Sequence, residues 1–279
     1  MAPQPLSGEL TAKLDALRAS LGAMDSALVA YSGGVDSSLV AFLAAEVLGA
    51  KALAVTSGSA SLKRSDLNLA KWLAEEWGMR HRVIVTDELS KPDYRANPVN
   101  RCFHCKTSLY TALASIARQE GFAEILNGTN TDDLGDHRPG LIAAEDFAVR
   151  SPLVEAGLDK AGVRALAAHL GLDNADKPQS ACLSSRFPYG ASINTERLAQ
   201  VERAEECLAR LGFVEFRVRH HEDVARLEIG ADELGRALEM RDTLQAEIQA
   251  CGYRFVALDL GAFRSGSLNE GIIKAVNIK

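Results

Sequence analysis

The sequence predicts an α/β protein whose larger part is a parallel sheet with helices on both faces, followed by a smaller α+β domain. Two observations carry this prediction. Short apolar segments alternate with helical segments from residue 26 to residue 129, and the order of elements changes after about residue 155. Because 47% of the 279 residues are hydrophobic, the chain can fill two modest cores. We therefore expect two domains, residues 1–155 and 156–279.

The first part of the chain reads as a leading helix and then a repeated strand and helix unit. Leucines at helical spacing predict the leading helix over residues 8–22. Short apolar runs predict strands over residues 26–32, 51–57, 81–87 and 123–129. The segments between them predict helices over residues 36–48, 66–77 and 106–119. Ligands of such sheets bind beyond the carboxyl ends of the strands.

The second part follows another pattern. A helix over residues 160–169 leads into a stretch rich in Gly, Pro, Ser and Asp, residues 171–192, which is too long to be a mere connector. Then come a helix over residues 195–211, strands over 214–220 and 224–230, a helix over 231–251 and a strand over 254–260. This order predicts a small α+β domain with an antiparallel sheet, which we expect to bind substrate and to build a homo-oligomer.

Composition excludes several classes of function. A net charge of −6 gives no general attraction for nucleic acid, so a small-molecule substrate is favoured. No apolar run is long enough for a membrane span, and the first thirty residues lack the pattern of a secretory signal, so we expect a cytoplasmic protein. In a reducing compartment, the pair Cys102 and Cys105 indicates a metal, cluster or redox site rather than a disulfide.

The stretch YSGGVDSSLV, residues 31–40, lies where the first strand meets the next helix. Gly33 and Gly34 can turn successive backbone N–H groups toward an anion, and the helix N-terminus adds positive partial charge. Asp36 can cap the helix or hold Mg²⁺. The further hydroxyl donors are Ser32, Ser37 and Ser38. The loop has neither the lysine of a Walker motif nor the G-x-G-x-x-G of dinucleotide folds.

The run Ser-Gly-Gly-Val-Asp-Ser-Ser resembles the signature of the PP-loop ATP pyrophosphatases. The resemblance implies that ATP is cleaved between its α- and β-phosphates and that a substrate oxygen is adenylated. It also implies nucleotide contacts at the end of the second strand, at Thr56 and Ser57. At the end of the fourth strand Gly128, and just after it Asp132, are candidates for nucleotide or Mg²⁺ contacts, with helix capping as the alternative for Asp132.

Further stretches resemble the LarE family: residues 97–106, 125–140, 180–190 and 258–270. That family thiolates pyridinium biscarboxylic acid mononucleotide during assembly of the nickel-pincer nucleotide cofactor. The resemblance implies two stages: ATP adenylates a substrate carboxylate, and a sulfur nucleophile then displaces AMP. A thiolate attacks an acyl adenylate well, and Mg²⁺ can neutralise the departing pyrophosphate.

The resemblance leaves two sources of sulfur open. In family members with one essential cysteine, the residue matched here by Cys182 gives up its own sulfur and the protein acts once. In another branch, three cysteines hold a [4Fe–4S] cluster with one iron free to carry extra sulfide, which Cys102, Cys105 and Cys182 fit in number. Zinc is a third reading, with a further ligand from His104 or His81.

Arginines are candidates for the anionic substrate. Arg217 and Arg219 share one strand face, and the corresponding pair in the family binds the substrate phosphate. Arg186 lies four residues after Cys182 and could hold a carboxylate beside the sulfur. Arg101 adjoins Cys102, where positive charge would favour a thiolate.

Three other functions are weaker readings of the same residues. A PP-loop tRNA thiolase should have a basic face, which the acidic composition disfavours. A non-catalytic nucleotide-binding module with structural zinc would bind ATP without releasing pyrophosphate. An amidotransferase-like ligase would need an ammonia-producing glutaminase domain, which the sequence does not contain.

Overall fold

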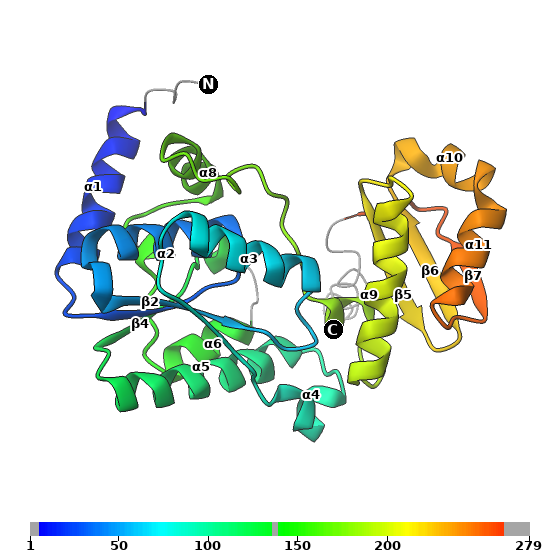
Figure 1. Cartoon of the computed structure of the whole chain (residues 1–279), viewed down its shortest axis with the longest axis horizontal. Helices are drawn as coiled ribbons and strands as arrows, with labels where there is room; N and C mark the ends of the chain where they lie inside the picture. Colours follow the sequence, from blue (N-terminus) through cyan, green and yellow to red (C-terminus); the bar gives the residue numbers. More distant parts are fainter. Residues whose placement is uncertain (1–5, 136–138, 265–279) are drawn as a thin grey trace, which may run out of the picture. The chain divides into compact units, whose positions relative to one another are not determined.

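A computed structural model of the protein describes residues 6–135 and 139–264. The chain forms two compact units (Figure 1). Unit 1 comprises residues 1–88 and 100–180, and unit 2 comprises residues 89–99 and 181–279. Within the described residues, no helix is both long and apolar enough to cross a membrane.

Unit 1 contains a four-stranded sheet in which every pair of neighbours is parallel. The strand order is β3-β2-β1-β4, which confirms the predicted fold class. The strands are β1 (Ala27–Ala30), β2 (Ala52–Ser57), β3 (His81–Ile84) and β4 (Glu124–Leu126). Because the strand order reverses at β1, its carboxyl end and that of β4 flank the crevice in which ligands of such sheets bind.

Helices cover both faces of this sheet (Figure 1). The helices of unit 1 are α1 (Gly8–Gly22), α2 (Val35–Leu48), α3 (Arg64–Glu76), α5 (Arg101–Glu120), α6 (Pro139–Asp146), α7 (Pro152–Glu155) and α8 (Lys160–His169). Short 3-10 turns cover Gly49–Lys51 and Thr131–Gly135, and a third, Glu88–Ser90, leads from unit 1 into unit 2. Successive β1 residues belong to different cores: Val29 packs with α1, α2 and α8, whereas Leu28 packs with α5 and α6. This alternation is the period of two expected of a strand that is buried on both sides.

The start of α5 differs from the prediction. The sequence pattern suggested a helix from about residue 106, but α5 begins at Arg101, directly after the turn that follows Pro98. Cys102 and Cys105 therefore lie on the first turns of a helix rather than in a loop. Residues three apart on a helix are neighbours on its surface, so the two thiols share one side of α5.

Unit 2 has a three-stranded sheet of order β5-β6-β7. Its strands are β5 (Phe216–His221), β6 (Val224–Ile229) and β7 (Phe255–Leu258). Its helices are α4 (Pro92–Arg95), α9 (Thr195–Arg210), α10 (Leu234–Glu239) and α11 (Arg241–Ala250), with 3-10 turns over Leu183–Arg186 and Ala231–Glu233. Helices α9 and α11 pack with the sheet around a second core.

The sheet of unit 2 is mixed, so the prediction of an antiparallel sheet was wrong for its last strand. β5 and β6 pair antiparallel through a tight hairpin, but β7 pairs parallel with β6. The reason is the connection, because helices α10 and α11 carry the chain back before β7 starts, as parallel neighbours require. A helix predicted over 231–251 is also divided at Met240.

The segment 89–99 packs with unit 2 although it lies between β3 and α5 in the sequence. Asn97 donates through Nδ2 to the carbonyl oxygen of Pro188 at 2.7 Å, and the Tyr94 hydroxyl lies 2.6 Å from Ser184 Oγ. The compact units also place α8 and the following residues up to Ser180 in unit 1, beyond the expected boundary at residue 155. Contacts between distant segments decide this division, and no local pattern encodes them.

Candidate functional site

The loop after β1 is built from small residues for steric reasons. Gly33 has φ +73°, and an added Cβ would lie 3.0 Å from Ala70 Cβ of α3. Gly34 is the N-cap of α2 and offers no side-chain cap. The backbone N–H of Ser32 donates to Ser37 Oγ at 3.1 Å, and the two hydroxyl oxygens are 3.0 Å apart. The loop therefore folds onto the positive end of α2, a geometry that suits an anion.

Gly128 allows the loop after β4 to approach α2 closely. A Cβ on Gly128 would lie 2.5 Å from the backbone nitrogen of Ser37 and 2.8 Å from the carbonyl carbon of Asp36. Such contacts with backbone atoms cannot be relieved by rotating a side chain. Gly128 thus lies against the backbone at the start of α2, a packing role in addition to the nucleotide contact predicted for it.

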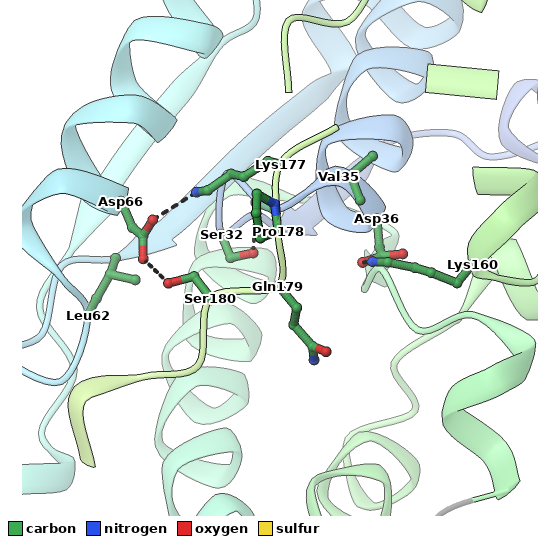
Figure 2. Close-up of a pocket in the computed structure, with 11 residues that line it drawn as sticks. Ser32, Val35, Asp36, Leu62, Asp66, Lys160, Lys177, Pro178, Gln179 and Ser180 are labelled. Carbon is green, nitrogen blue, oxygen red and sulfur yellow. Dashed lines mark hydrogen bonds and ion pairs between the residues drawn. The ribbon is translucent and has the colours of Figure 1, made fainter. Parts of the chain in front are cut away.

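A pocket of about 200 Å³ opens beside this loop (Figure 2). Its lining residues are Ser32, Gly34, Val35, Asp36, Leu62, Asp66, Lys160, Lys177, Pro178, Gln179 and Ser180. The segment Lys177–Ser180 passes beside Ser32, with Lys177 and Ser180 directed at Asp66 (Figure 2). Three of the predicted residues, Ser32, Gly34 and Asp36, therefore line one cavity, and two lysines that were not predicted, Lys160 and Lys177, line it too.

Lys160 places a cation at the mouth of the phosphate loop. Its ammonium group pairs with Asp36 Oδ2, while Asn130 donates to Asp36 Oδ1 at 3.1 Å. The backbone N–H of Lys160, the first residue of α8, donates to Asp132 Oδ2 at 3.0 Å, while Asp159 is the N-cap of this helix. Lys160 and Asn130 thus each bind one oxygen of the Asp36 carboxylate.

Lys177 forms the opposite side of the pocket. It bonds Asp66 Oδ1 at 2.8 Å, and Ser180 Oγ donates to Asp66 Oδ2 at 2.6 Å. Burial alone would raise the pKa of Asp66, but the hydrogen bonds from Lys177 and Ser180 outweigh it and hold the pKa below its usual range. The two lysines thus bring two cations to the lining of the cavity, each paired with a carboxylate, and a polyphosphate could take the place of either carboxylate as the partner.

Other predicted nucleotide residues support the loop without lining the pocket. Ser38 is fully buried and accepts a bond from Asn174 Nδ2 at 2.8 Å, and the same nitrogen donates to the Gly33 carbonyl. The Thr56 hydroxyl donates to the carbonyl oxygen of Tyr31 at 2.8 Å and lies 2.8 Å from His81 Nε2. Ser37 and Ser57 likewise bond to neighbouring hydroxyl groups, those of Ser32 and Thr86.

His81 is tied to the sheet and not to the cysteines. Because the Thr56 hydroxyl already gives its proton to Tyr31, it accepts from His81, which places the imidazole proton on Nε2. Burial, with a smaller effect of Lys71, lowers the pKa of His81 and keeps the ring neutral. This arrangement gives no support to His81 as a zinc ligand.

In unit 1, Cys102 is exposed and Cys105 is half-buried on the first turns of α5. Lys106 follows them, and the neighbouring Tyr110, with smaller effects of Cys105 and Cys102, raises the pKa of its ammonium group. Lys106 therefore remains a cation beside the thiols. Arg101, in contrast, is a buried residue, with 4% of its surface exposed.

In unit 2, Cys182 is half-buried and starts the 3-10 turn Leu183–Arg186. The Arg186 guanidinium, which is fully buried, forms a two-point ion pair with Glu205 at 2.8 and 3.0 Å. Arg219 is similarly paired with Glu228, at 2.9 and 2.8 Å. Arg186 and Arg219, two of the four candidate arginines, therefore each have a carboxylate partner within the protein.

Arg217 differs from these two. Its Nη1 donates to the carbonyl oxygen of Phe216 at 2.7 Å, and its guanidinium lies over the Phe263 ring, 4.9 Å from the centroid. In the part of the chain that the structure describes, no carboxylate lies within ion-pair distance of Arg217. Burial and then the positive charge of Arg186 lower its pKa, so an anion bound there would relieve an unfavourable field.

No group of three or more His, Cys, Asp or Glu side chains suited to a metal ion occurs within residues 6–135 and 139–264. Cys102 and Cys105 belong to unit 1 and Cys182 to unit 2, so each unit supplies only part of the predicted cluster ligand set. Part of the motif at 258–270, residues 265–270, lies outside the described residues.

The remaining cysteines lie in the core of unit 2. Cys207 and Cys251 are both buried, with their sulfur atoms 3.7 Å apart. Burial, with the neighbouring Cys207, raises the pKa of the Cys251 thiol to about 11. They are core residues, as their helical surroundings indicated.

Comparison with known proteins agrees with this geometry. Residues 14–101 match the asparagine synthase family, which shares the PP-loop. An uncharacterized protein of Synechocystis is 43% identical over 95% of this chain and 100% of its own length. The pyridinium-3,5-bisthiocarboxylic acid mononucleotide synthase of Lactiplantibacillus plantarum is 40% identical over 84% of this chain and 85% of its own. An uncharacterized protein of Methanocaldococcus jannaschii is 29% identical over 71% and 76%. The chain belongs to the LarE family and is an ATP-dependent sulfurtransferase with a PP-loop domain.

Proposed function

We propose that this enzyme transfers sulfur to the carboxylates of pyridinium-3,5-biscarboxylic acid mononucleotide, using ATP to activate each carboxylate as an adenylate. The observation that carries the proposal is the likeness to the Lactiplantibacillus plantarum synthase over most of both chains. The pocket beside the phosphate loop supports it, because Lys160 and Lys177 suit a polyphosphate. In unit 2, Arg217 suits the substrate phosphate.

Mg²⁺ would be held by the phosphates of ATP together with Asp36, since magnesium sites often use one or two carboxylates plus substrate phosphates. Bound there, the ion would neutralise charge on the departing pyrophosphate. To bind the ion, Asp36 would exchange its ion pair with Lys160 for a bond to Mg²⁺. The lysine would then be free to meet a phosphate oxygen, so both groups would keep a partner of opposite charge.

Two sources of sulfur remain in the proposal. A [4Fe–4S] cluster held by Cys102, Cys105 and Cys182 would supply a sulfide carried on its fourth iron. The accessibility of these three thiols, in contrast to Cys207 and Cys251, supports this reading. The alternative is Cys182 as a single-use donor, which its half-exposed position also suits.

The C-terminal domain is proposed to bind substrate and to form the homo-oligomer. Unit 2 exposes large apolar side chains that a partner subunit would cover, namely Val214, Leu238, Phe255 and Leu260. Light scattering of the purified protein tests this, and a monomer at working concentration would refute it. The cytoplasmic location stays a prediction.

The reaction is tested on protein purified without oxygen. With ATP, Mg²⁺, sulfide and the biscarboxylate mononucleotide, we expect pyrophosphate and a thiocarboxylate product 16 mass units heavier per oxygen replaced by sulfur, a shift that follows from atomic masses alone. Iron and acid-labile sulfide are measured on the same protein. About four irons per chain, lost in Cys102→Ala and Cys182→Ala, would support the cluster. Product limited to one sulfur per chain, without iron, would support the sacrificial cysteine, and no product would refute the proposal.

A further inference from the structure

Arg186 holds the backbone on both sides of the sulfur-donor candidate. Its Nη1 donates to the carbonyl oxygens of Ala181 and Cys182, at 2.8 and 3.0 Å. The same nitrogen lies 2.9 Å from Ser185 Oγ, and that hydroxyl in turn donates to the Cys182 carbonyl at 2.8 Å. The carbonyl of Cys182 is therefore fixed by several donors, while its side chain remains half-exposed.

Glu205 keeps the guanidinium in place. It binds Nε and Nη2 of Arg186 through both oxygens, and it also accepts from the backbone N–H of Val218 in β5 at 3.2 Å. The pair thus links helix α9 and strand β5 to the Cys182 turn. Because the guanidinium is planar and rigid, binding a carboxylate through Nε and Nη2 fixes the direction in which Nη1 points.

A second buried pair holds the same turn from another side. Arg219, paired with Glu228, donates through Nη1 to the carbonyl oxygen of Ser185 at 2.7 Å. Neither guanidinium is available to a ligand from solvent, because Arg186 is 0% and Arg219 6% exposed. Both arginines therefore face the protein backbone.

We propose that Arg186 is a positioning residue for sulfur transfer, which fixes the Cα–Cβ direction of Cys182 and so the place where its sulfur is presented. It does not bind the substrate carboxylate, contrary to the role that its sequence position suggested. This inference rests on the proposed function, in which the sulfur leaves or is held at Cys182. A small displacement of a reacting group is enough to slow a reaction whose binding steps are intact.

The test compares Arg186→Lys with wild-type enzyme. Lysine keeps the positive charge, but its single ammonium nitrogen cannot bind Glu205 and the two backbone carbonyls at once as the planar guanidinium does. The matched control is Arg197→Lys, since Arg197 also joins a carboxylate, Glu222, and a backbone carbonyl, that of Ser192, but away from Cys182. At saturating substrate, we expect the rate of thiocarboxylate formation to fall about 10-fold or more in Arg186→Lys. The half-saturating substrate concentration and pyrophosphate release should stay within about 2-fold of wild type.

A second readout does not depend on the substrate. The rate at which iodoacetamide alkylates Cys182, followed by mass spectrometry of the Cys182 peptide, should rise about 5-fold or more in Arg186→Lys, because a loosened turn exposes the half-buried thiol. Glu205→Gln should change both the rate of thiocarboxylate formation and the rate of alkylation in the same direction as Arg186→Lys. It replaces Arg186→Lys as the test variant if that protein does not fold. Arg197→Lys should leave both unchanged.

The outcomes separate the two hypotheses. A raised half-saturating concentration with an unchanged maximal rate would make Arg186 a substrate ligand and overturn the inference. Unchanged alkylation and an unchanged rate in the variants that fold would also overturn it. If wild-type enzyme forms no thiocarboxylate, the proposed function fails, whereas the alkylation rates still decide whether Arg186 holds the Cys182 turn.

Discussion

The phosphate loop of unit 1 and the Cys182 turn of unit 2 both carry residues that the proposed reaction uses, yet different interactions hold the two segments in place. Glycines shape the phosphate loop, and Gly128 lets a neighbouring backbone lie against it. Two buried ion pairs, Arg186 with Glu205 and Arg219 with Glu228, hold the Cys182 turn. Beside the phosphate loop, Lys160 and Lys177 line a pocket. At the Cys182 turn, the two arginines are buried in their ion pairs.

This difference shows that a charged residue near a reactive group is not by itself a ligand for substrate. Lys160 and Lys177 are partly exposed in their ion pairs, with 30% and 18% of their side chains accessible. Arg186 has no accessible surface. Partners at a solvent-exposed pair exchange readily because the pair is weak, whereas a buried pair is held by the cost of leaving either charge alone.

Removing Arg186 should give the largest effect. Arg186→Ala leaves Glu205 buried without its cation, and we expect the free energy of unfolding of unit 2 to fall by about 3–5 kcal/mol. Urea denaturation followed by far-UV circular dichroism measures it. Arg197→Ala breaks a pair in which the Glu222 side chain is 64% exposed, and it should cost less than about 1 kcal/mol. Equal losses in the two variants would refute the contrast between buried and exposed pairs.

The cysteines of unit 2 should differ in reactivity by a large factor. A pKa of about 11 for Cys251 places its thiolate fraction at pH 8 roughly 100-fold below that of an ordinary thiol. Alkylation of Cys251 in native protein should therefore speed up as pH rises toward 11, while Cys182 is modified at pH 8. Peptide mass spectrometry after timed alkylation checks this, with denatured protein as the control. Equal rates in native protein at pH 8 would show that the core of unit 2 is open.

Gly128→Ala tests the close packing of unit 1. The added Cβ would clash with backbone atoms of Asp36 and Ser37, so α2 and its loop must shift. We expect a loss of about 1–3 kcal/mol in stability and an ATP affinity lower by about 10-fold. Calorimetric titration with ATP measures the affinity. Gly8→Ala is the control, because a Cβ at Gly8 meets no atom within 4 Å. Wild-type affinity in Gly128→Ala would refute the packing argument.

Asp66 should give the smallest effect, which depends on pH. Its folded-state pKa is lowered, so its stabilising contribution is present above the unfolded pKa and is lost as pH falls through the folded one. Asp66→Asn should cost about 1 kcal/mol or less at pH 7 after solvent screening, and this cost should shrink as pH falls through the lowered pKa of Asp66. Thermal unfolding between pH 7 and pH 2 follows this difference, with Glu46→Gln at the exposed Arg18 pair as the control. A difference that persists unchanged at pH 2 would refute it.

Local sequence determined much of the fold and part of the site. The periodicity of Leu10, Leu14, Leu17 and Leu21 placed α1 within the bounds that the structure has, because one helix face must be apolar to be buried. The glycines and serines after β1 likewise identified the phosphate loop, since few residue types fit that backbone. The structure adds that Ser32 and Gly34 of this loop line one pocket together with Asp36.

Tertiary structure decided how each charge is used. Arg186, Arg217 and Arg219 look alike in the sequence, and nothing local shows that Glu205 and Glu228 neutralise two of them. Lys160 and Lys177 were missed because each follows β4 by more than thirty residues, and only chain folding returns them to β1. The parallel pairing of β7 was also decided at this level. Hydrophobic periodicity depends on residues that are neighbours along the chain, so the sequence alone determined most of the helices and strands. Charge compensation depends on which distant segments meet, so only the tertiary structure determined the roles of the ionic side chains.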